Sequence, residues 1–368
     1  MTGPRWDVAV VGGGLAGLCA ALQLAAAGRS VVVVEKSRGV GGRMATRRLG
    51  GAVVDHGAQF FTVRGAPFDE LVIEGRRSGV VTEWCRGFAR GGSLADPLTE
   101  AADGHVRWRG VRGMTDLAKK LADDLRAVPD PRCEILCDAR VVSLGPDGEG
   151  VRLVVESRSG TTALLAGAAV MTAPVPQSLE LLASGGLLDP PGGGVDPAAV
   201  ARLRDVSYEP CFALMLVLDR DSLVPPPGAI QFVADVSNPL AWVADNLQKG
   251  ISPVPALTVH ASAEFSRRRF DAPPDLVIAE LLEHVRPWID GDPSTAVVER
   301  ALHRWKFAAP ATIVPTPWVA ISSAPPIVCC GDAFAGPRVE GAAASGLAAG
   351  RWLADRARPP GTRPHARP

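Results

Sequence analysis

The sequence predicts an α/β protein that combines a Rossmann-like nucleotide domain with a second, α+β domain. The first indication is the opening stretch, in which an apolar run, three consecutive glycines and an apolar helical segment follow one another. The second is a short apolar strand followed by a small-residue helix near the end of the chain. The third is a series of apolar β-type runs between residues 209 and 264, which predicts a separate sheet.

The opening stretch is uncharged from Val8 to Gly28, which is long enough for a membrane helix. Three glycines at 12, 13 and 14 would weaken a helix by roughly 1 kcal/mol each, but they suit a tight turn between a strand and a helix. The cationic start of a signal peptide is reduced to a single arginine. We therefore predict a strand over 6–11, a helix over 15–27 that ends at Gly28, and a buried strand over 30–35.

The turn in this unit carries a dinucleotide-binding pattern. Gly12, Gly14 and Gly17 form G-x-G-x-x-G, and Glu35 stands at the end of the second strand. The first glycine permits the turn, the second lets backbone approach a pyrophosphate, and the third lets the helix pack closely on the strand. A carboxylate at this place suits a ribose diol and repels a 2′-phosphate. The predicted contacts of this unit are with Gly12, Gly14, Leu15, Ala16, Gly17 and Glu35.

The segment after Glu35 carries a second glycine pair. It reads KSRGVGGRMATRR, and DHGAQFF follows from Asp55. The pattern resembles the flavin-containing amine oxidase superfamily, in which this loop folds back over the cofactor and an arginine meets the pyrophosphate. A guanidinium fork suits the paired oxygens of two phosphates. The resemblance adds contacts with Lys36, Gly42, Arg43, Met44, Gly57, Ala58 and Gln59.

The middle of the chain predicts a helix over 115–126 with Thr115 as N-cap, and then three strands that end in the corner TAPVP. These strands are predicted over 139–144, 151–156 and 164–172. Residues 184–198 are too rich in Gly and Pro for regular structure. The β-type runs that follow, with a helix after them, predict a sheet with helices against one face. They lie at 209–218, 229–235, 240–245 and 256–264, and the helix at 275–287.

The end of the chain carries a second cofactor motif, IVCCGDAFAGPRVEGAAASGLAAGRWLA from Ile327. Similar flavoproteins place the aspartate of Gly331-Asp332 at the ribityl and pyrophosphate region, and the N-terminus of the next helix at the flavin pyrimidine ring. A helix N-terminus there stabilises the negative charge of reduced flavin. The resemblance therefore implies non-covalent FAD in a glutathione-reductase-type nucleotide domain. The contacts it implies here are Val142, Gly331, Asp332, Glu340, Gly341 and Ala342.

These elements predict a discontinuous FAD-binding domain and an inserted substrate domain. We assign residues 1–60, 110–175 and 320–356 to the FAD-binding domain, and residues 61–109 and 176–319 to the substrate domain. The basic, proline-rich residues 357–368 are expected to form a disordered tail.

Further motifs resemble renalase and its bacterial relatives. In order along the chain they are MTAPVPQSLELL, SYEPCFALMLVLD, QFVADVSNP, TVHAS, HRWKFA and CGDAFAG. The resemblance implies an oxidase that takes a hydride from nicotinamide dinucleotides reduced at the 2 or 6 position of the ring, giving NAD(P)+ and hydrogen peroxide. Such a substrate regains aromaticity when it loses hydride, so placement over the flavin is the main requirement.

The pocket residues follow from the same resemblance. Phe232, His260 and Trp305 are expected opposite the flavin, with a phenylalanine at 232 where some relatives have tyrosine. Arg338, in GPRVEG, stands where amine oxidases place a ring that cages the amine. A fixed cation is a poor neighbour for an ammonium group and a good one for a phosphate-bearing nucleotide. Arg338 is therefore the fourth predicted pocket residue.

Two alternatives stay open at this stage. An oxidase of mono- or polyamines remains possible, because tryptophan or phenylalanine rings can also form an amine cage. A flavoprotein that only transfers electrons to a partner protein is the third reading. Reaction of the flavin with dihydro-NAD isomers, with amines or with neither distinguishes the three.

The amino-acid composition argues against several classes of binding partner. Basic and acidic residues are balanced at 39 each, so no overall field favours nucleic acid or an anionic membrane. The seven cysteines show neither zinc-site spacing nor a disulfide framework, which predicts reduced thiols in a cytoplasmic protein. We expect a small dinucleotide substrate and oxygen as the reaction partners, and no metal.

Overall fold

The computed structural model describes residues 5–92, 97–188, 194–233, 238–334 and 336–356, which form two compact units. Unit 1 comprises Met1–Gly42, Ala118–Ser207 and Pro310–Pro368. Unit 2 comprises Arg43–Leu117 and Tyr208–Ala309. Both units are therefore discontinuous in sequence.

The unit boundaries differ from the domain boundaries that the sequence analysis placed after residues 60, 109, 175 and 319. Residues 43–60 contain the hairpin of β3 (Thr46–Leu49) and β4 (Ala52–Asp55), which packs on the sheet of unit 2 through Leu49, Ala52 and Val54. Residues 176–207 contain α4 (Val175–Ser184) and α5 (Pro197–Arg204), and α4 packs on the β8 strand of unit 1. Tertiary packing of these two segments sets the boundaries. The predicted tail at 357–368 lies outside the described residues.

Unit 1 is built on a mainly parallel sheet. Its path runs through β16 (Val319–Ser323), β17 (Pro326–Cys329), β10 (Gly160–Met171), β1 (Trp6–Val11), β2 (Val31–Val34) and β7 (Cys133–Leu136). All neighbours from β17 to β7 are parallel, whereas β16 is antiparallel. The sheet continues through a hairpin of β8 (Ala139–Asp147) and β9 (Gly150–Ser157). In it, β9 pairs antiparallel with the first half of the long β10 strand, and β8 pairs with β9. The valines of β1 and β2 are almost completely buried, as expected for parallel strands covered on both faces.

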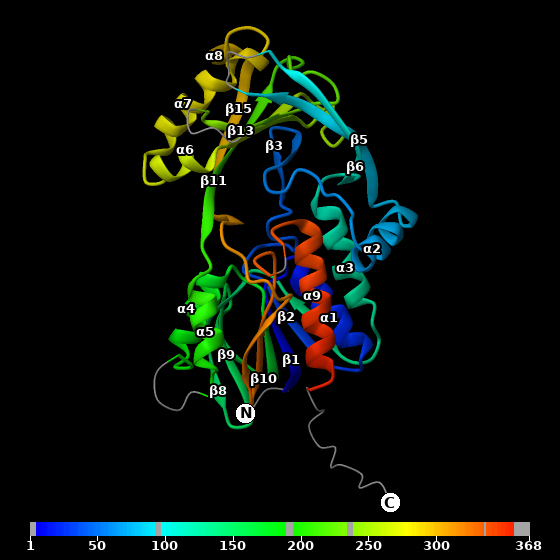
Figure 1. Cartoon of the computed structure of the whole chain (residues 1–368), viewed down its shortest axis with the longest axis vertical. Coiled ribbons are helices and arrows are strands. Elements are labelled where there is room, and N and C mark those ends of the chain that lie inside the picture. The colour runs from blue at the N-terminus through cyan, green and yellow to red at the C-terminus, as the bar shows by residue number, and fades with distance from the viewer. Residues whose placement is uncertain (1–4, 93–96, 189–193, 234–237, 335, 357–368) are drawn as a thin grey trace, which may run out of the picture. The chain divides into compact units, whose positions relative to one another are not determined.

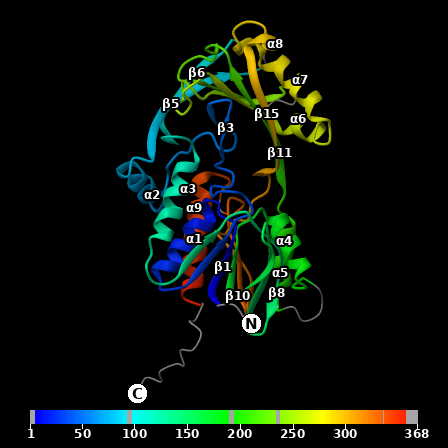
Figure 2. The ribbon, with the colours of Figure 1, turned by 180° about the vertical axis from the view of Figure 1, so that it is seen from behind.

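Helices α1 (Leu15–Ala26) and α9 (Val339–Ala354) lie side by side against this sheet (Figure 1, Figure 2). Their contact depends on glycine. A Cβ atom at Gly346 would lie 2.1 Å from the carbonyl oxygen of Ala16, and one at Gly350 would lie 2.8 Å from that of Ala20. The α3 helix (Thr115–Arg126) begins at the end of unit 2 and continues into unit 1.

Unit 2 is built on a seven-stranded sheet of mixed direction. Its order is β15 (Val297–Pro310), β11 (Tyr208–Leu218), β14 (Ala256–Ala261), β13 (Leu240–Asp245), β12 (Ala229–Phe232), β5 (Val81–Gly91) and β6 (Thr99–Gly110). The unit also holds helical segments, of which α7 packs on β13 and β14, and α6 on β11. They are α2 (Ala66–Arg77), α6 (Ala263–Arg268), α7 (Pro274–Val285), a 3-10 turn (Arg286–Trp288) and α8 (Pro293–Ala296).

The two faces of this sheet have different neighbours. Ile230, Val243, Val259 and Leu214 stand next to one another across four strands and form the apolar core with α7. The residues between them in each strand point to the opposite face. There Trp242 and His260 are directly paired across β13 and β14. This second face carries the polar groups described below.

Most predicted elements are confirmed: the strand, helix and strand of the opening unit, the helix at 115–126, β8 to β10 in unit 1, β11 to β14 in unit 2 and the helix after residue 274. The strands β5, β6, β7 and β15 were not predicted. The strand predicted over 256–264 is too long, because Ser262 caps α6 by accepting from the Phe265 amide. The irregular segment predicted over 184–198 ends earlier, because Asp196 caps α5 at Pro197, and its residues 189–193 lie outside the described chain. Residues 234–235 of the run predicted over 229–235 also lie outside it. In the part of the chain that the structure covers, each helix is too short or too polar to span a bilayer.

The α1–α9 contact gives a stability prediction. Replacing Gly346 with Ala adds a methyl group against the Ala16 carbonyl, and we expect a loss of about 1–3 kcal/mol in the free energy of unfolding despite the better helix propensity of alanine. Chemical unfolding followed by circular dichroism measures it. The control is Gly39→Ala, where a Cβ atom meets no atom within 4 Å and the loss should stay below about 0.5 kcal/mol. Equal stability of the two variants would contradict this account of the contact.

Candidate functional site

The glycine turn at the end of β1 is shaped by close backbone approach. Gly12 has a φ of +110°, and a Cβ atom there would lie 2.5 Å from the Oγ1 atom of Thr172. A Cβ atom at Gly17 would lie 2.0 Å from the Gly12 carbonyl oxygen. The Thr172 hydroxyl donates to the carbonyls of Val11 (2.9 Å) and Gly12 (3.2 Å). Thr172, the residue after β10, therefore stabilises the glycine turn through these two hydrogen bonds. The sequence motif TAPVP did not predict this role.

The Glu35 carboxylate is buried beside this turn. Its Oε2 atom accepts from the Gly13 amide and its Oε1 atom from the Ser37 amide, both at 2.7 Å. These bonds fix the orientation of the carboxylate, and each oxygen retains a lone pair for a further donor. Glu35 can thus accept from a ribose hydroxyl while it holds the turn closed. Lys36, the next predicted contact, is exposed.

The loop after Glu35 folds back onto the glycine turn, as the sequence predicted. The Gly41 amide donates to the Gly13 carbonyl at 2.9 Å, and Gly41 forms a parallel bridge with Gly14. A Cβ atom at Gly42 would lie 3.3 Å from the Gly14 Cα atom. At Gly14 itself, a Cβ atom would meet nothing within 4 Å, so the backbone there is open to a ligand.

The second predicted motif reaches the same edge of the sheet. The Cys330 amide, just after β17, donates to the Met171 carbonyl at 3.0 Å, beside Thr172. Gly331 follows with a φ of +141°, and half-buried Asp332 comes next. The carboxyl ends of the parallel strands β2, β1, β10 and β17 therefore meet here, which is where α/β sheets bind nucleotides.

The remaining predicted contacts of unit 1 surround this edge. Arg338 is the exposed N-cap of α9, and a Cβ atom at Gly341 would lie 2.1 Å from the Gly336 carbonyl oxygen. Val142 stands at an irregularity in the β8–β9 pairing. The others lie in the first turns of the two helices, namely Leu15, Ala16 and Gly17 in α1 and Glu340, Gly341 and Ala342 in α9. Open backbone, a fixed carboxylate and the N-terminus of α1 fit the adenosine and pyrophosphate parts of FAD.

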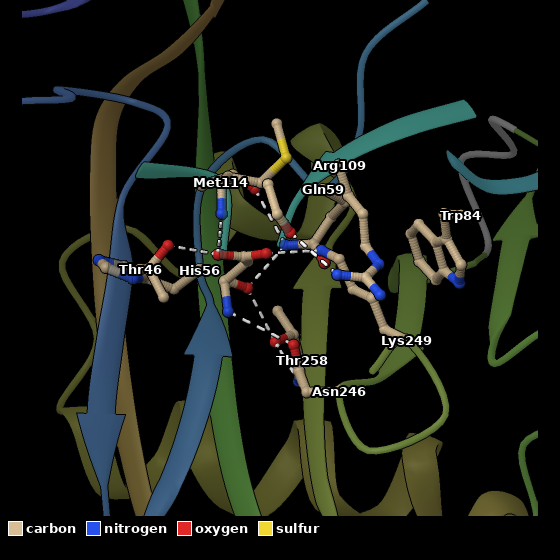
Figure 3. A network of polar contacts seen from close by, with 12 residues as sticks. Thr46, His56, Gln59, Trp84, Arg109, Met114, Asn246, Lys249 and Thr258 are labelled. Atoms are coloured by element: carbon tan, nitrogen blue, oxygen red, sulfur yellow. Dashed lines mark hydrogen bonds and ion pairs between the residues drawn. The ribbon is translucent and has the colours of Figure 1, made fainter. Parts of the chain in front are cut away.

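Unit 2 contains a buried polar network around Asp55, whose partners Thr46, Met114, Gln59, Lys249 and Thr258 are labelled in Figure 3. One carboxylate oxygen of Asp55 accepts from the Thr46 hydroxyl (2.5 Å) and the Met114 amide (2.8 Å), and the other from the Lys249 ammonium group (2.7 Å). The side chains of Asp55 and Lys249 are both 0% exposed. The Asp55 carbonyl accepts from Gln59 and Thr258.

The next carbonyl along the chain, that of His56, joins two of the predicted pocket residues. The Trp305 indole donates to it at 2.8 Å, and the Nε2 atom of His260 lies 3.2 Å away. Because a carbonyl only accepts, His260 carries its proton on Nε2. The rings of His56 and Trp305 are stacked, with centroids 5.5 Å apart, and His303 packs against both. Sequence reasoning missed His56 and His303.

Charge and burial keep these imidazoles neutral. Burial lowers the pKa of His56 to about 3, helped by repulsion from His303 whenever that imidazole is protonated and from the Arg47 guanidinium. Burial lowers the pKa of His260 to about 4. The pKa of His303 falls for the same reason and through the charge of Arg47. Near neutral pH this region therefore presents flat, uncharged rings.

The predicted contacts from Arg43 to Gln59 lie in unit 2. The Arg43 side chain donates to the Phe307 carbonyl at 3.4 Å and lies over the Tyr208 ring. The Arg43 carbonyl accepts from the Ala58 amide, and a Cβ atom at Gly57 would lie 2.0 Å from it. Met44 and Gln59 are buried. Whether Arg43 meets a pyrophosphate stays a prediction.

One predicted pocket residue lies elsewhere. Phe232 was expected beside His260 and Trp305, but it is on the opposite face of the sheet, in the apolar core, with its ring 5.3 Å from that of Trp288. The reason is strand alternation: the Phe232 side chain lies on the same face as that of Ile230, whereas Gln231 lies on the face of Trp242 and His260.

Arg338, the fourth predicted pocket residue, belongs to unit 1. No group of His, Cys, Asp and Glu side chains in the described ranges could hold a metal ion.

Comparisons with known proteins agree with both parts of the chain. Residues 10–71 match the model of an NAD(P)-binding Rossmann-like domain, and residues 78–351 match that of the flavin containing amine oxidoreductases. The "Putative flavin-containing monoamine oxidase AofH" of Mycobacterium tuberculosis is 37% identical over 129 residues. That match covers 30% of this chain and only 28% of the relative.

Solved structures share the fold over nearly the whole chain. A "Putative protoporphyrinogen oxidase" from Exiguobacterium has a TM-score of 0.67 at 12% identity, covering 96% of this chain and 99% of that one. Wild-type putrescine oxidase bound to putrescine has a TM-score of 0.67 at 16% identity, covering 96% and 98%. At these identities the likeness concerns the fold alone.

The geometry of Glu35 gives a binding prediction. In Glu35→Gln the bond from the Gly13 amide loses its charge, and we expect the Kd for FAD to rise roughly tenfold. Titration of the apoprotein with FAD, followed by flavin fluorescence, measures it. Glu134→Gln changes a half-buried glutamate of β7 that pairs with Arg132 and serves as the matched control. An unchanged Kd in Glu35→Gln would show that the carboxylate is not part of the nucleotide site.

The neutral imidazoles give a pH prediction. The pKa values of His56 and His260 in the folded chain lie below the usual 6.5, so between pH 6.5 and about 4 the unfolded chain binds protons that the folded chain does not. Stability should therefore fall as the pH drops through this window. His260→Gln keeps a donor for the His56 carbonyl and should lower the slope of the unfolding free energy by up to about 1 kcal/mol per pH unit.

Urea unfolding at several pH values measures this slope. His105→Gln alters an exposed histidine and is the control, which should keep the slope of the unaltered protein. The same slope in both variants would mean that His260 is not held neutral by burial.

Proposed function

The chain belongs to the flavin-containing amine oxidoreductase family, which implies non-covalent FAD as cofactor, and from this premise we propose that it oxidises dihydronicotinamide dinucleotides. The substrates would be 2- or 6-dihydro-NAD(P) isomers, and the products NAD(P)+ and hydrogen peroxide. Bound FAD supplies the hydride acceptor and the means of passing electrons to oxygen. The residues of the protein would hold the dihydronicotinamide ring in place and keep other charged groups away from it.

The observation that carries the proposal is the uncharged ring surface of unit 2. Trp305 and His260 are fixed on one carbonyl, and the stacked His56 and Trp305 rings, 5.5 Å apart, leave no space between them for an ammonium group. The Arg47 charge further disfavours a cation near His56. Such a surface suits a flat, electron-rich ring whose dinucleotide carries phosphates.

The proposed reaction requires little acid–base catalysis from these residues. The nitrogen lone pair of a 2- or 6-dihydronicotinamide expels the hydride as the ring becomes aromatic, so no proton has to be removed from the substrate. Neutral imidazoles and an indole can orient the ring without competing for that lone pair. Placement alone can supply a large part of the rate enhancement, since effective molarities of well-oriented groups reach about 10⁵–10⁸ M.

An amine oxidase is the second candidate. It is favoured by the likeness to AofH and by the fold shared with a putrescine oxidase solved with putrescine. Unit 2 also holds an aromatic cluster of Phe60, Trp84, Phe88 and Trp242 that could contact an apolar amine. Cations of the protein already lie over three rings of this cluster, Arg107 over Phe60 and Phe88 and Lys249 over Trp84, and both are paired with carboxylates. These contacts leave less of the ring faces for a cationic ligand.

The proposal includes oxygen as the second substrate and the cytoplasm as the location. All seven cysteines are unpaired, which supports a reducing compartment.

Anaerobic mixing of the flavin-loaded protein with each candidate substrate tests the function. We expect 2- or 6-dihydro-NAD(P) to bleach the flavin at least about 100-fold faster than putrescine or cyclohexylamine, a difference of about 3 kcal/mol in the barrier. The ordinary 4-dihydro isomer is the control for nucleotide binding without productive ring placement. Faster bleaching by an amine would favour the second candidate. Bleaching by no substrate would contradict both.

A further inference from the structure

The pair of Lys249 and Asp55 is buried completely and lies within unit 2. Nζ and Oδ2 are 2.7 Å apart, and both side chains are 0% exposed. The pair joins the turn after β13 to the end of β4, positions 194 residues apart in the sequence. Two charges taken out of water are seldom stabilising compared with apolar residues of the same size, so such a pair calls for a role beyond stability.

The remaining donors around the Asp55 carboxylate come from other elements. Thr46 belongs to β3, and the Met114 amide immediately precedes α3. With Lys249, three donors from three parts of the chain leave the carboxylate one orientation (Figure 3). The ammonium group also lies 4.8 Å from the centre of the Trp84 ring, a favourable cation–π distance.

The backbone beside this carboxylate is held equally firmly. The Asp55 carbonyl accepts from Gln59 (2.7 Å) and from the Thr258 hydroxyl (2.8 Å), which in turn accepts from Asn246 (3.0 Å). The next carbonyl is that of His56, to which Trp305 and His260 donate. The Lys249 ammonium group is thus connected to the two rings by its bond to the Asp55 carboxylate, the covalent backbone from Asp55 to His56, and the bonds to the His56 carbonyl.

We propose that Lys249 is a positioning residue, which through Asp55 fixes the His56 carbonyl and so the orientations of the Trp305 indole and the His260 imidazole. This inference rests on the proposed function only in that those two rings are the surface on which the substrate ring is placed. Lys249 itself, being fully covered, need not touch the substrate.

A cation is required at position 249 for this role. If Lys249 is replaced by Met, the buried Asp55 carboxylate loses the cation that donates to it, because the nearby Arg109 guanidinium donates instead to the Gly110 and Val111 carbonyls. The carboxylate then takes up a proton or moves towards water. Either change weakens the bonds from Thr46 and Met114 and loosens the peptide that carries the His56 carbonyl. The pKa of Lys249 lies below its usual value, chiefly because of burial and also because of the Arg109 charge, and the Asp55 carboxylate opposes this shift.

The test compares Lys249→Met, Asp55→Asn and the double variant Asp55→Asn/Lys249→Met in the full, flavin-loaded chain. The double variant removes both charges together and so remains foldable if a single unpaired charge prevents folding. Lys120→Met is the matched control, because Lys120 forms an ion pair of similar length with Asp124 on α3. The primary readout is solvent exchange of the Trp305 indole N–H by ¹⁵N NMR, with the resonance identified by its loss in Trp305→Phe.

We expect exchange of the Trp305 indole to be at least about tenfold faster in all three variants at Asp55 and Lys249, and unchanged in Lys120→Met. The rate of flavin reduction at saturating substrate should fall at least about tenfold, whereas KM changes less than about threefold. Wild-type exchange and rate in the double variant would overturn the proposal, since the pair would then only balance charge. If the wild-type protein oxidises no dihydronicotinamide, the proposed function fails, and the exchange measurement still decides the positioning role.

Discussion

Close approach of backbone to backbone at the end of β1 is the constraint on which the nucleotide unit depends. The Gly12 carbonyl leaves no room for a side chain at Gly17, and the Thr172 hydroxyl leaves none at Gly12. The same contact brings α1, β10 and the returning loop at Gly41 to one edge of the sheet. The Glu35 carboxylate is hydrogen-bonded to Gly13, next to the open backbone at Gly14. Sterics therefore build the nucleotide site before any ligand is bound.

The second unit depends on a different kind of constraint, a single buried carboxylate with three donors. Asp55 stabilises the corner at which β4 ends, and the residues immediately after it present their backbone to the rings of Trp305 and His260. The result is an ordered surface that is aromatic and uncharged near neutral pH, since burial holds His56 and His260 in their neutral forms. Family membership explains the flavin, and the proposed preference for a ring-shaped substrate over an ammonium ion rests on this surface.

The nucleotide unit was largely predictable from the sequence, because glycines, apolar strands and helix starts act over short distances. Predictions from local patterns failed where contacts between segments distant in the sequence determine the position of a side chain. Phe232 and Gln231 are equally plausible pocket residues in the sequence, and only the register of β12 with β13 shows which of them shares a face with His260. Lys249 looks like a surface charge in a polar turn until it is found against Asp55. The His56 carbonyl, as a backbone atom, has no side-chain signal at all.

The central claim is that a flat dihydronicotinamide ring gives up a hydride to FAD in this protein. Anaerobic titration of the flavin-loaded chain with 2- or 6-dihydro-NAD(P), with the nucleotide product identified by chromatography, tests it most directly. The account predicts one NAD(P)+ formed for each flavin reduced, and one hydrogen peroxide released when air is admitted. Flavin that stays oxidised in the presence of excess dihydronicotinamide, or that is reduced without formation of NAD(P)+, would contradict it.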